Sequence, residues 1–323
     1  MKHIVKVNHT VTPREGQDRK IRIISIGDIH FGMKMKLQKV KRAFQLAESL
    51  NPDYICLPGD NLDTTNVIDS MDKRLEFMEL LEYSGSIAPT MVSLADHDQR
   101  YRGEDGHLSI DFRNKFWSNV DKIPNVYVLN NSEYEDENAR FLGYTLPSYY
   151  YHGKYELPKY SKCSQERLDE DVDVLIEDME LNSSLFRPFT YGDKYSAVLF
   201  HSPQHIDNEE VAYHLSGFNH IFAGHMHEGC MPPVFDDLIP GDKGIISPQH
   251  TLFTGKSRGI IKTSYGSICI ITGGITKIHE SANAILQPFN SVFPMHIDVV
   301  DVVPKEEGKV KSYTRKSYYK YVK

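Results

Sequence analysis

Five apolar runs in this chain are each followed by an aspartate or a histidine, and this repetition constrains the fold more than any other feature. The runs read as buried β-strands because they are rich in Ile, Val, Leu and Phe and are bounded by Gly, Pro or polar residues. In open α/β sheets, sites assemble at the carboxyl ends of strands, so these polar side chains are predicted to meet. In chain order they are Asp28 and His30, Asp60 and Asp63, Asp96, His97 and Asp98, His201, and His225 and His227.

The rest of the pattern predicts a layered α/β fold. Strands that are buried on both faces and mixed with helices are typical of such layers. Further strand-like runs cover residues 126–130, 139–145, 267–272 and 296–303. Apolar residues at helical spacing predict helices over residues 36–50, 71–83 and 168–181.

Composition excludes several classes of protein. The chain of 323 residues carries 37 basic and 44 acidic residues, a net charge of -7, which gives no overall attraction to nucleic acid or an anionic membrane. No apolar stretch approaches the roughly 18 residues that span a bilayer, and the start has no apolar signal core, so we expect a cytoplasmic protein. The widely spaced cysteines argue against a disulfide framework or a zinc knuckle; they are Cys56, Cys163, Cys230 and Cys269.

The residue types at the strand ends indicate metal binding. Carboxylate oxygens and imidazole nitrogens are the ligands that hard and borderline divalent ions prefer. Residues two apart in an extended chain point the same way, so Asp28 and His30 can serve one site, and His225 and His227 can face the same cavity. There are too many candidates for one tetrahedral ion. Two ions about 3.5–4 Å apart that share a carboxylate are the arrangement used in phosphate ester hydrolysis. The alternative is that these Asp and His residues only act as caps and form hydrogen bonds at strand ends. It would have to explain the spacing and the strand-end position of every block at once.

Five blocks resemble the signatures of calcineurin-like metallophosphoesterases. They are "GDIH", "GDNLD", "ADHD", "FHS" and "GHMH", and the resemblance spans about residues 21 to 230. It implies a four-layer αββα sandwich, with two mixed β-sheets flanked by helices. We expect that domain over residues 21–303, after an N-terminal extension (1–20) and before a basic, tyrosine-rich C-terminal tail (304–323).

The resemblance also implies a role for each residue. Asp28, His30 and His227 would bind the first ion, and Asp60 would bridge both ions. The second ion would be bound by Asp96, His201 and His225. His97 would protonate the leaving oxygen or steady the phosphate, and Asp63 would hydrogen-bond His97 and orient it. The implied activity is hydrolysis of a phosphomonoester or phosphodiester in one in-line displacement by a two-metal-activated hydroxide. Because the site is rich in imidazole, Mn, Fe or Zn is expected rather than Mg or Ca.

Three positions depart from the family pattern. The family has Gly-Asn where this chain has Ala95 and Asp96, and an ionised Asp offers no hydrogen-bond donor to phosphate. We therefore expect tighter metal binding at the second site, and weaker phosphate binding unless a cation such as Arg100 or Arg258 compensates. Glu228 follows "GHMH" where bacterial relatives often carry Gly; it either alters the pocket or faces solvent.

Two alternative functions stay open. The first is a DNA or RNA nuclease of the same family, which the acidic balance disfavours and only the basic tail favours. The second is a non-catalytic metal-binding scaffold. The tyrosine-rich segment 147–160 is expected either to line the pocket or to pack as a surface loop.

Overall fold

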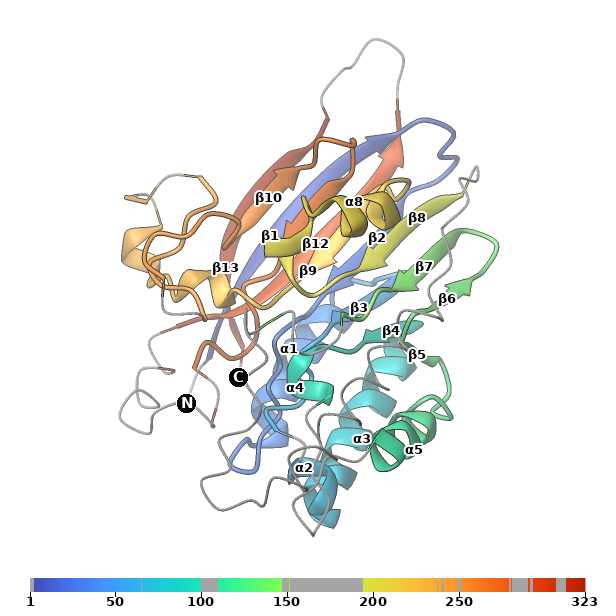
Figure 1. Ribbon diagram of the computed structural model, residues 1–323, viewed down its shortest axis with the longest axis vertical. Helices are drawn as coiled ribbons and strands as arrows, with labels where there is room; N and C mark the ends of the chain where they lie inside the picture. The colour runs from blue at the N-terminus through green and yellow to red at the C-terminus, as the bar shows by residue number, and fades with distance from the viewer. Residues whose placement is uncertain are drawn as a thin grey trace.

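The chain forms two β-sheets with helices outside them, as the computed structural model in Figure 1 shows. The structure describes residues 3–64, 66–99, 110–146, 151, 194–236, 238–239, 241–248, 251–278, 280, 290, 293–305 and 312–322.

The first sheet contains seven of the described strands, in the spatial order β13-β1-β12-β2-β3-β4-β5. Strands β2, β3, β4 and β5 are parallel, and β12 is antiparallel to β2. At the other edge β1 pairs in parallel with β12, and β13 pairs antiparallel to β1. The bounds are β1 His3–Arg14, β2 Ile21–Ser25, β3 Tyr54–Pro58, β4 Thr90–Ser93, β5 Val126–Leu129, β12 Met295–Pro304 and β13 Thr314–Val322.

The second sheet contains six of the described strands, in the order β10-β11-β9-β8-β7-β6. Its four central strands are parallel, while β6 and β10 close the edges in antiparallel pairing. The bounds are β6 Ser132–Glu135, β7 Ala139–Gly143, β8 Tyr195–Leu199, β9 His220–Ala223, β10 Gly259–Lys262 and β11 Ile268–Ile271.

Helices and short 3₁₀ turns connect the strands. The helices are α1 Leu37–Glu48, α2 Asn66–Asp69, α3 Met71–Ile87, α4 Asp96–Gln99, α5 Ile110–Val120 and α8 Glu209–Leu215. The 3₁₀ turns are η1 Pro203–His205, η2 His227–Gly229 and η3 Pro233–Phe235. None of the helices in the described part of the chain combines the length and apolar character that crossing a bilayer requires.

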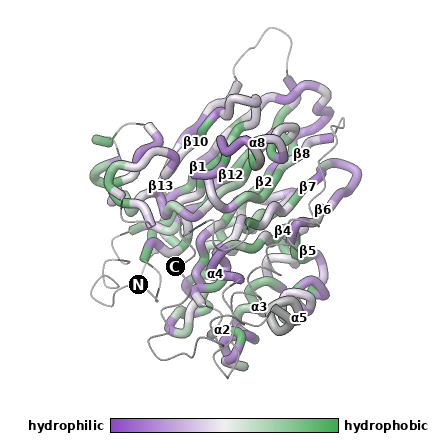
Figure 2. The backbone as a smooth tube through the Cα atoms, viewed as in Figure 1, coloured by the Kyte–Doolittle hydropathy of each residue, from purple (hydrophilic) through white to green (hydrophobic). Residues whose placement is uncertain are grey.

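Three apolar clusters separate four layers, which confirms the predicted αββα sandwich. One packs α1, α3 and α5 on the outer face of the first sheet, around Phe44 and Phe77. A second lies between the sheets and includes Ile23 and Phe222. The third packs α8 on the second sheet. Figure 2 shows the matching pattern, with apolar residues along the strands and hydrophilic residues at α4. Because both faces of each sheet are covered, strands such as β3 and β9 are buried along their whole length.

Parts of both segments expected to flank the domain are strands of its first sheet. β1 lies within the segment 1–20, and β13 lies within the segment 304–323. Thr314–Val322, which lies inside the segment expected as a basic, tyrosine-rich tail, is thus an edge strand that pairs with β1. The alternation of Lys or Arg with Tyr there is the pattern of an edge strand that is half exposed. The domain limits at 21 and 303 stay a prediction. The helix expected over 168–181 and Cys163 lie outside the described residues.

Candidate metal centre

The carboxyl ends of parallel strands from both sheets point toward one place. Asp28 and His30 follow β2, and Asp60 follows β3. Asp96 opens α4 directly after β4. In the second sheet His201 follows β8, and His225 and His227 follow β9. The parallel connections bring these loops to the same end of the sandwich.

The side chains form groups with the spacing of metal ligands. One group contains Asp60, Asp96, His201 and His225, and a second contains Asp28, His30 and His227. A third group joins His30, Asp60 and His97, so Asp60 lies between the first two. Within each group the potential ligand atoms are within 4.8 Å of one another. Among the described residues the structure therefore brings the seven candidate ligands together in these overlapping groups, and their role as ligands stays a prediction.

Asp60 is the centre of this arrangement. Its Oδ2 atom lies 3.1 Å from Nε2 of His201 and 3.4 Å from Nε2 of His30. Oδ1 of Asp28 lies 3.9 Å from Nε2 of His201 and 4.0 Å from Nε2 of His227. These carboxylates and imidazoles are buried.

Backbone carbonyls fix the tautomers of three histidines. Nδ1 of His201 lies 2.7 Å from the carbonyl oxygen of Pro58, and Nδ1 of His227 lies 2.8 Å from that of Thr276. A carbonyl oxygen only accepts, so Nδ1 carries the hydrogen in each ring. In His227, whose ring is neutral, Nε2 keeps its lone pair, which is the form that binds a metal ion. Burial lowers the pKa of His201, but the neighbouring Asp60 carboxylate outweighs it and raises that pKa to about 10, so His201 would give up its Nε2 proton on binding an ion. Nδ1 of His97 makes the same kind of bond to the carbonyl of Asp63.

The expected link between Asp63 and His97 exists, but it differs in its atoms. The hydrogen bond runs to the backbone carbonyl of Asp63. The Asp63 carboxylate accepts a hydrogen bond from the backbone N–H of Glu280 at 2.8 Å, and it lies 3.8 Å from Nδ1 of His30. The spacing of the sequence block does not reveal which oxygen atom faces the ring.

Five of the candidate ligands have left-handed backbone conformations. The φ angles are 46° at Asp28, 45° at His30, 52° at Asp60, 68° at His225 and 48° at His227. Each such non-glycine residue is strained, and this kind of strain collects at functional sites. Hydrogen bonds hold the turns: the N–H of His30 donates to the carbonyl of Asp60 at 2.9 Å, and the N–H of His225 donates to Oδ1 of Asp28 at 2.8 Å.

The electrostatics of the site favour a cation. Burial raises the pKa of Asp28 to about 7. Burial also raises the pKa of Asp60, but His201, His97 and His30 outweigh it and hold that pKa well below its usual value. Burial lowers the pKa of His225 to about 3 and that of His227 to about 4, so both rings are neutral and able to bind a metal ion.

The residues present fit bound divalent ions. Oδ2 of Asp28 is buried and has no hydrogen-bond partner among the described residues, although such atoms are normally paired. Gly224 leaves the room around this atom, since a Cβ atom there would lie 2.7 Å from Asp28 Oδ2. Close carboxylates with neutral imidazoles are the donor set of Mn, Fe or Zn.

Asp98 has a structural role that the sequence left unassigned. Its buried carboxylate accepts hydrogen bonds from the backbone N–H groups of Asn61, Leu62 and Ala95, each at 3.0 Å. It thus ties the loop after β3 to the start of α4, and so places Asp60 relative to Asp96. The one sequence feature that pointed to Asp98 was its position within the block "ADHD", next to the candidate site residues Asp96 and His97.

The sequence analysis named three further contributors to the pocket: the segment 147–160, Arg258 and Arg100. Tyr151 is the one described residue of the segment 147–160, and its buried ring lies 5.2 Å from the ring of His225 and 5.8 Å from that of His201. Arg258 donates to Asp236 at 2.9 Å and to backbone carbonyls of residues 236, 239 and 243. Its guanidinium is thus held in that loop. Arg100 lies outside the described residues.

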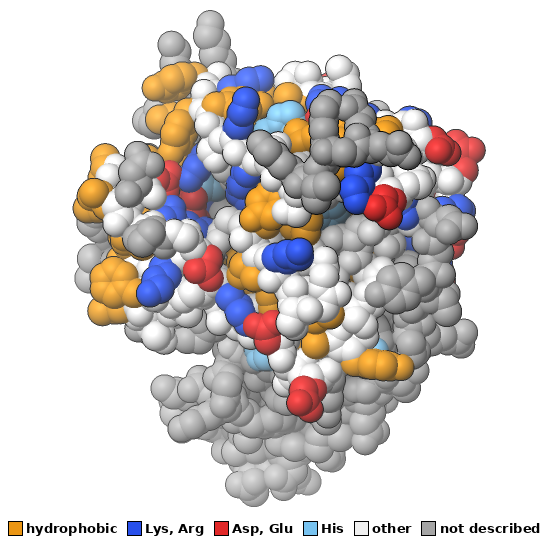
Figure 3. Space-filling model, turned by 90° about the horizontal axis from the view of Figure 1, so that it is seen from above, with side chains coloured by type: hydrophobic (Ala, Val, Ile, Leu, Met, Phe, Trp, Pro, Cys, Tyr) orange, Lys and Arg blue, Asp and Glu red, His pale blue; other side chains and the backbone are white. Residues whose placement is uncertain are grey.

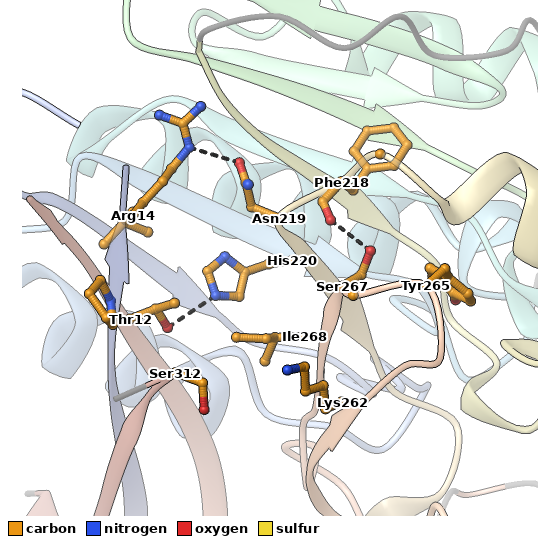
Figure 4. Close-up of a pocket in the computed structure, with 14 residues that line it drawn as sticks. Thr12, Arg14, Phe218, Asn219, His220, Lys262, Tyr265, Ser267, Ile268 and Ser312 are labelled. Carbon is orange, nitrogen blue, oxygen red and sulfur yellow. Dashed lines mark hydrogen bonds between the residues drawn. The ribbon is translucent and has the colours of Figure 1, made fainter. Parts of the chain in front are cut away.

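A cavity of about 360 Å³ lies elsewhere, at the amino-terminal ends of β9 and β11. Figure 4 shows His220, Arg14 and Lys262 among its lining residues. None of the candidate ligands lines this cavity. It is therefore separate from the metal centre, which lies at the carboxyl ends of the same strands.

Comparisons with known proteins identify the family. The sequence profile of the family described as calcineurin-like phosphoesterase matches residues 21–229. A search of curated proteins finds no match. A dimetal phosphatase from Danio rerio is similar in structure, with a TM-score of 0.40 and 12% identity over 80% of this chain and 88% of that chain. The Thermus thermophilus sulfate thiohydrolase SoxB has a TM-score of 0.36 and 7% identity, over 93% of this chain and 56% of that chain.

Proposed function

Since this chain belongs to the calcineurin-like phosphoesterase family, we propose that it hydrolyses a phosphomonoester or phosphodiester at a centre of two divalent ions. The observation that carries the proposal is the position of Asp60 between two groups of potential ligands. A carboxylate shared by two such groups is what a two-ion centre needs.

Each group would hold one ion. Asp28, His30 and His227 would bind the first, Asp96, His201 and His225 the second, and Asp60 both. Bound ions of the Mn, Fe or Zn type would supply Lewis acidity, which activates water and offsets the charge on the phosphate oxygens.

His97 is the residue placed to move a proton. Its ring lies 4.6 Å from the ring of His30, measured between centroids, so it borders the ligand groups. Its Nδ1 hydrogen is bonded to the Asp63 carbonyl, so it is the doubly protonated imidazolium form of His97 that would give a leaving oxygen the proton on Nε2.

A nuclease activity is less well supported. The chain has a net charge of -7, and a protein that tracks a phosphate backbone normally presents a basic surface. On the face seen in Figure 3, Lys and Arg side chains are interspersed with Asp and Glu among the residues drawn in colour. A cytoplasmic location stays a prediction.

The test is hydrolysis of p-nitrophenyl phosphate and bis-p-nitrophenyl phosphate by metal-stripped protein refilled with Mn²⁺. We expect metal-dependent turnover that Asp60→Asn abolishes. Asp301→Asn is the matched control, because Asp301 is also a buried, ion-paired aspartate of the first sheet but lies on β12, outside the ligand groups. The preferred substrate separates a monoesterase from a diesterase. Two bound ions without turnover of either substrate would favour the scaffold alternative.

A further inference from the structure

A cluster of buried charged side chains adjoins the turn that carries His227. We call it the Glu228 cluster; its members are Lys6, Glu228, Asp236, Lys277 and His296. Four of them are at most 7% exposed, although they come from β1, η2, β12 and the loop after β11. Burying charges is costly unless they are paired.

Glu228 is the centre of the cluster. Its Oε1 atom accepts from Nζ of Lys6 at 2.8 Å, and its Oε2 atom lies 2.8 Å from Nε2 of His296 and 3.5 Å from Nζ of Lys277. Lys6 also pairs with Asp236 at 2.6 Å, and Asp236 in turn pairs with Arg258. Glu228 therefore does not face solvent, which was one of the two expectations for it.

The cluster and the metal centre share one turn and one loop. Nδ1 of His227 donates to the carbonyl of Thr276, while the neighbouring Glu228 pairs with the neighbouring Lys277. The N–H of Thr276 donates to the carbonyl of Asp28 at 3.1 Å, and its hydroxyl donates to the carbonyl of Ile29 at 2.8 Å. The consecutive residues His227 and Glu228 thus contact the consecutive residues Thr276 and Lys277, beside Asp28. We call this double contact the clamp.

The clamped turn is one that the chain does not adopt readily by itself. His227, Glu228 and Cys230 have φ angles of 48°, 58° and 47°. Non-glycine residues in this region are strained and persist only where their surroundings hold them. Among the contacts of the described residues, two ion pairs fix the Glu228 side chain to β1 and to the 272–277 loop, and its contact with His296 fixes it to β12.

We propose that Glu228 is a positioning residue for the first ion: its ion pairs with Lys6 and Lys277 and its contact with His296 lock the left-handed turn and so aim Nε2 of His227 at the site shared with Asp28 and His30. This inference rests on the proposed two-ion centre. It predicts that losing the Glu228 charge weakens one ion and spares the other.

The experiment measures metal binding directly. Metal-stripped full-length chains of the wild type, Glu228→Gln and Asp236→Asn are titrated with MnCl₂ by calorimetry. Bound Mn²⁺ is then counted by elemental analysis after dialysis. Asp236→Asn is the matched control because it removes another carboxylate from Lys6 but does not touch the His227 turn. We expect Glu228→Gln to bind one ion as the wild type does and the other 10–100-fold more weakly, the usual effect of removing a group that orients a ligand. Asp236→Asn should keep both affinities.

Two further chains make the result decisive. In an Asp28→Asn background, which already lacks a first-ion ligand, Glu228→Gln should add no further loss. If Glu228→Gln does not fold, Lys277→Gln opens only one side of the clamp and should weaken the same ion. Wild-type affinity for both ions in Glu228→Gln and Lys277→Gln would overturn the positioning role. A loss in Asp236→Asn equal to that in Glu228→Gln would overturn it as well. If the wild type bound no Mn²⁺, the proposed function itself would fail.

Discussion

Nδ1 of His97 lies 2.5 Å from the backbone carbonyl oxygen of Asp63, and the same side chain forms a group of potential ligands with His30 and Asp60. A residue that transfers a proton without holding an ion should affect rate and not metal content. His97→Ala is therefore expected to lower kcat by about 10²–10⁴-fold. Bound Mn²⁺ should stay at the wild-type level. Steady-state kinetics with the preferred nitrophenyl ester, together with metal analysis, test this.

Asp63→Asn is the companion variant. The backbone carbonyl that orients His97 remains, and the asparagine side-chain oxygen can still accept from the N–H of Glu280. We expect only a small loss of kcat. A loss as large as that of His97→Ala would show that the carboxylate, and not the carbonyl, is what His97 needs.

Asp96→Asn restores the amide that the family carries at this position. Asp96 lies in the ligand group with Asp60, His201 and His225, so removing its charge should weaken the second ion. The amide adds a donor and takes away a negative charge, so inorganic phosphate should inhibit at lower concentration. Calorimetric titration with Mn²⁺ and the Ki for phosphate measure the two effects. Unchanged values for both would remove any special role for the carboxylate.

The sequence predicts the centre of this fold better than its margins. Strands β2, β3, β4, β8 and β9 are covered on both faces, so each appears as a mainly apolar run that polar residues of the site follow. Edge strands such as β13 alternate polar and aromatic residues over a half-exposed face, a pattern that also fits an exposed tail.

The sequence pattern could not predict side-chain contacts between segments that lie far apart in the chain. The motif spacing predicted which residues face the centre, but Lys6, Glu228, Lys277 and His296 are separated by up to 290 residues, and their pairing follows only from the strand order. The same holds for Asp63, whose carbonyl performs the role expected of its carboxylate.

Asp98→Ala should destabilise the fold. The alanine leaves three buried backbone N–H groups, those of Asn61, Leu62 and Ala95, without their acceptor. Leaving such donors unsatisfied costs about 1–3 kcal/mol each, so the loss in free energy of unfolding should be several kcal/mol. Asp98→Asn keeps an oxygen acceptor and should lose less. Denaturant titration of both variants and the wild type, all metal-free, measures this. A free energy of unfolding for Asp98→Ala equal to that of the wild type would contradict the role of Asp98 in tying the loop after β3 to α4.

Removing the metal should lower the melting temperature. Ions that bind only the folded chain stabilise it by about 2.7 kcal/mol per site when the free ion is at 100 times its Kd. A chelator removes this stabilisation and leaves Asp28, Asp60 and Asp96 close together without a cation. Thermal unfolding of Mn²⁺-loaded protein with and without EDTA measures the change. Asp60→Asn, which lacks the shared carboxylate, should show a much smaller EDTA effect.

His220 should make the fold sensitive to acid. Burial lowers its pKa to about 3, and the neutral ring lies 3.0 Å from the Tyr195 hydroxyl and 3.1 Å from that of Thr12. The unfolded chain takes up a proton here below pH of about 6.5, whereas the folded chain does not. Stability from this group is therefore complete above that pH, and falls as the pH drops from about 6.5 toward 3, by up to about 1.4 kcal/mol per pH unit.

His220→Gln removes this proton uptake. Urea unfolding of both chains between pH 4.5 and 7.5, in the same metal state, should give a shallower loss of stability for the variant on the acid side. Above neutral pH the two curves should run parallel, with the variant lower by the cost of its altered hydrogen bonds to Thr12 and Tyr195. The remaining slope of the variant belongs to the other groups, including His296, whose pKa burial lowers to about 4. Parallel curves over the whole range would show that His220 takes up a proton in the folded chain as readily as in the unfolded one.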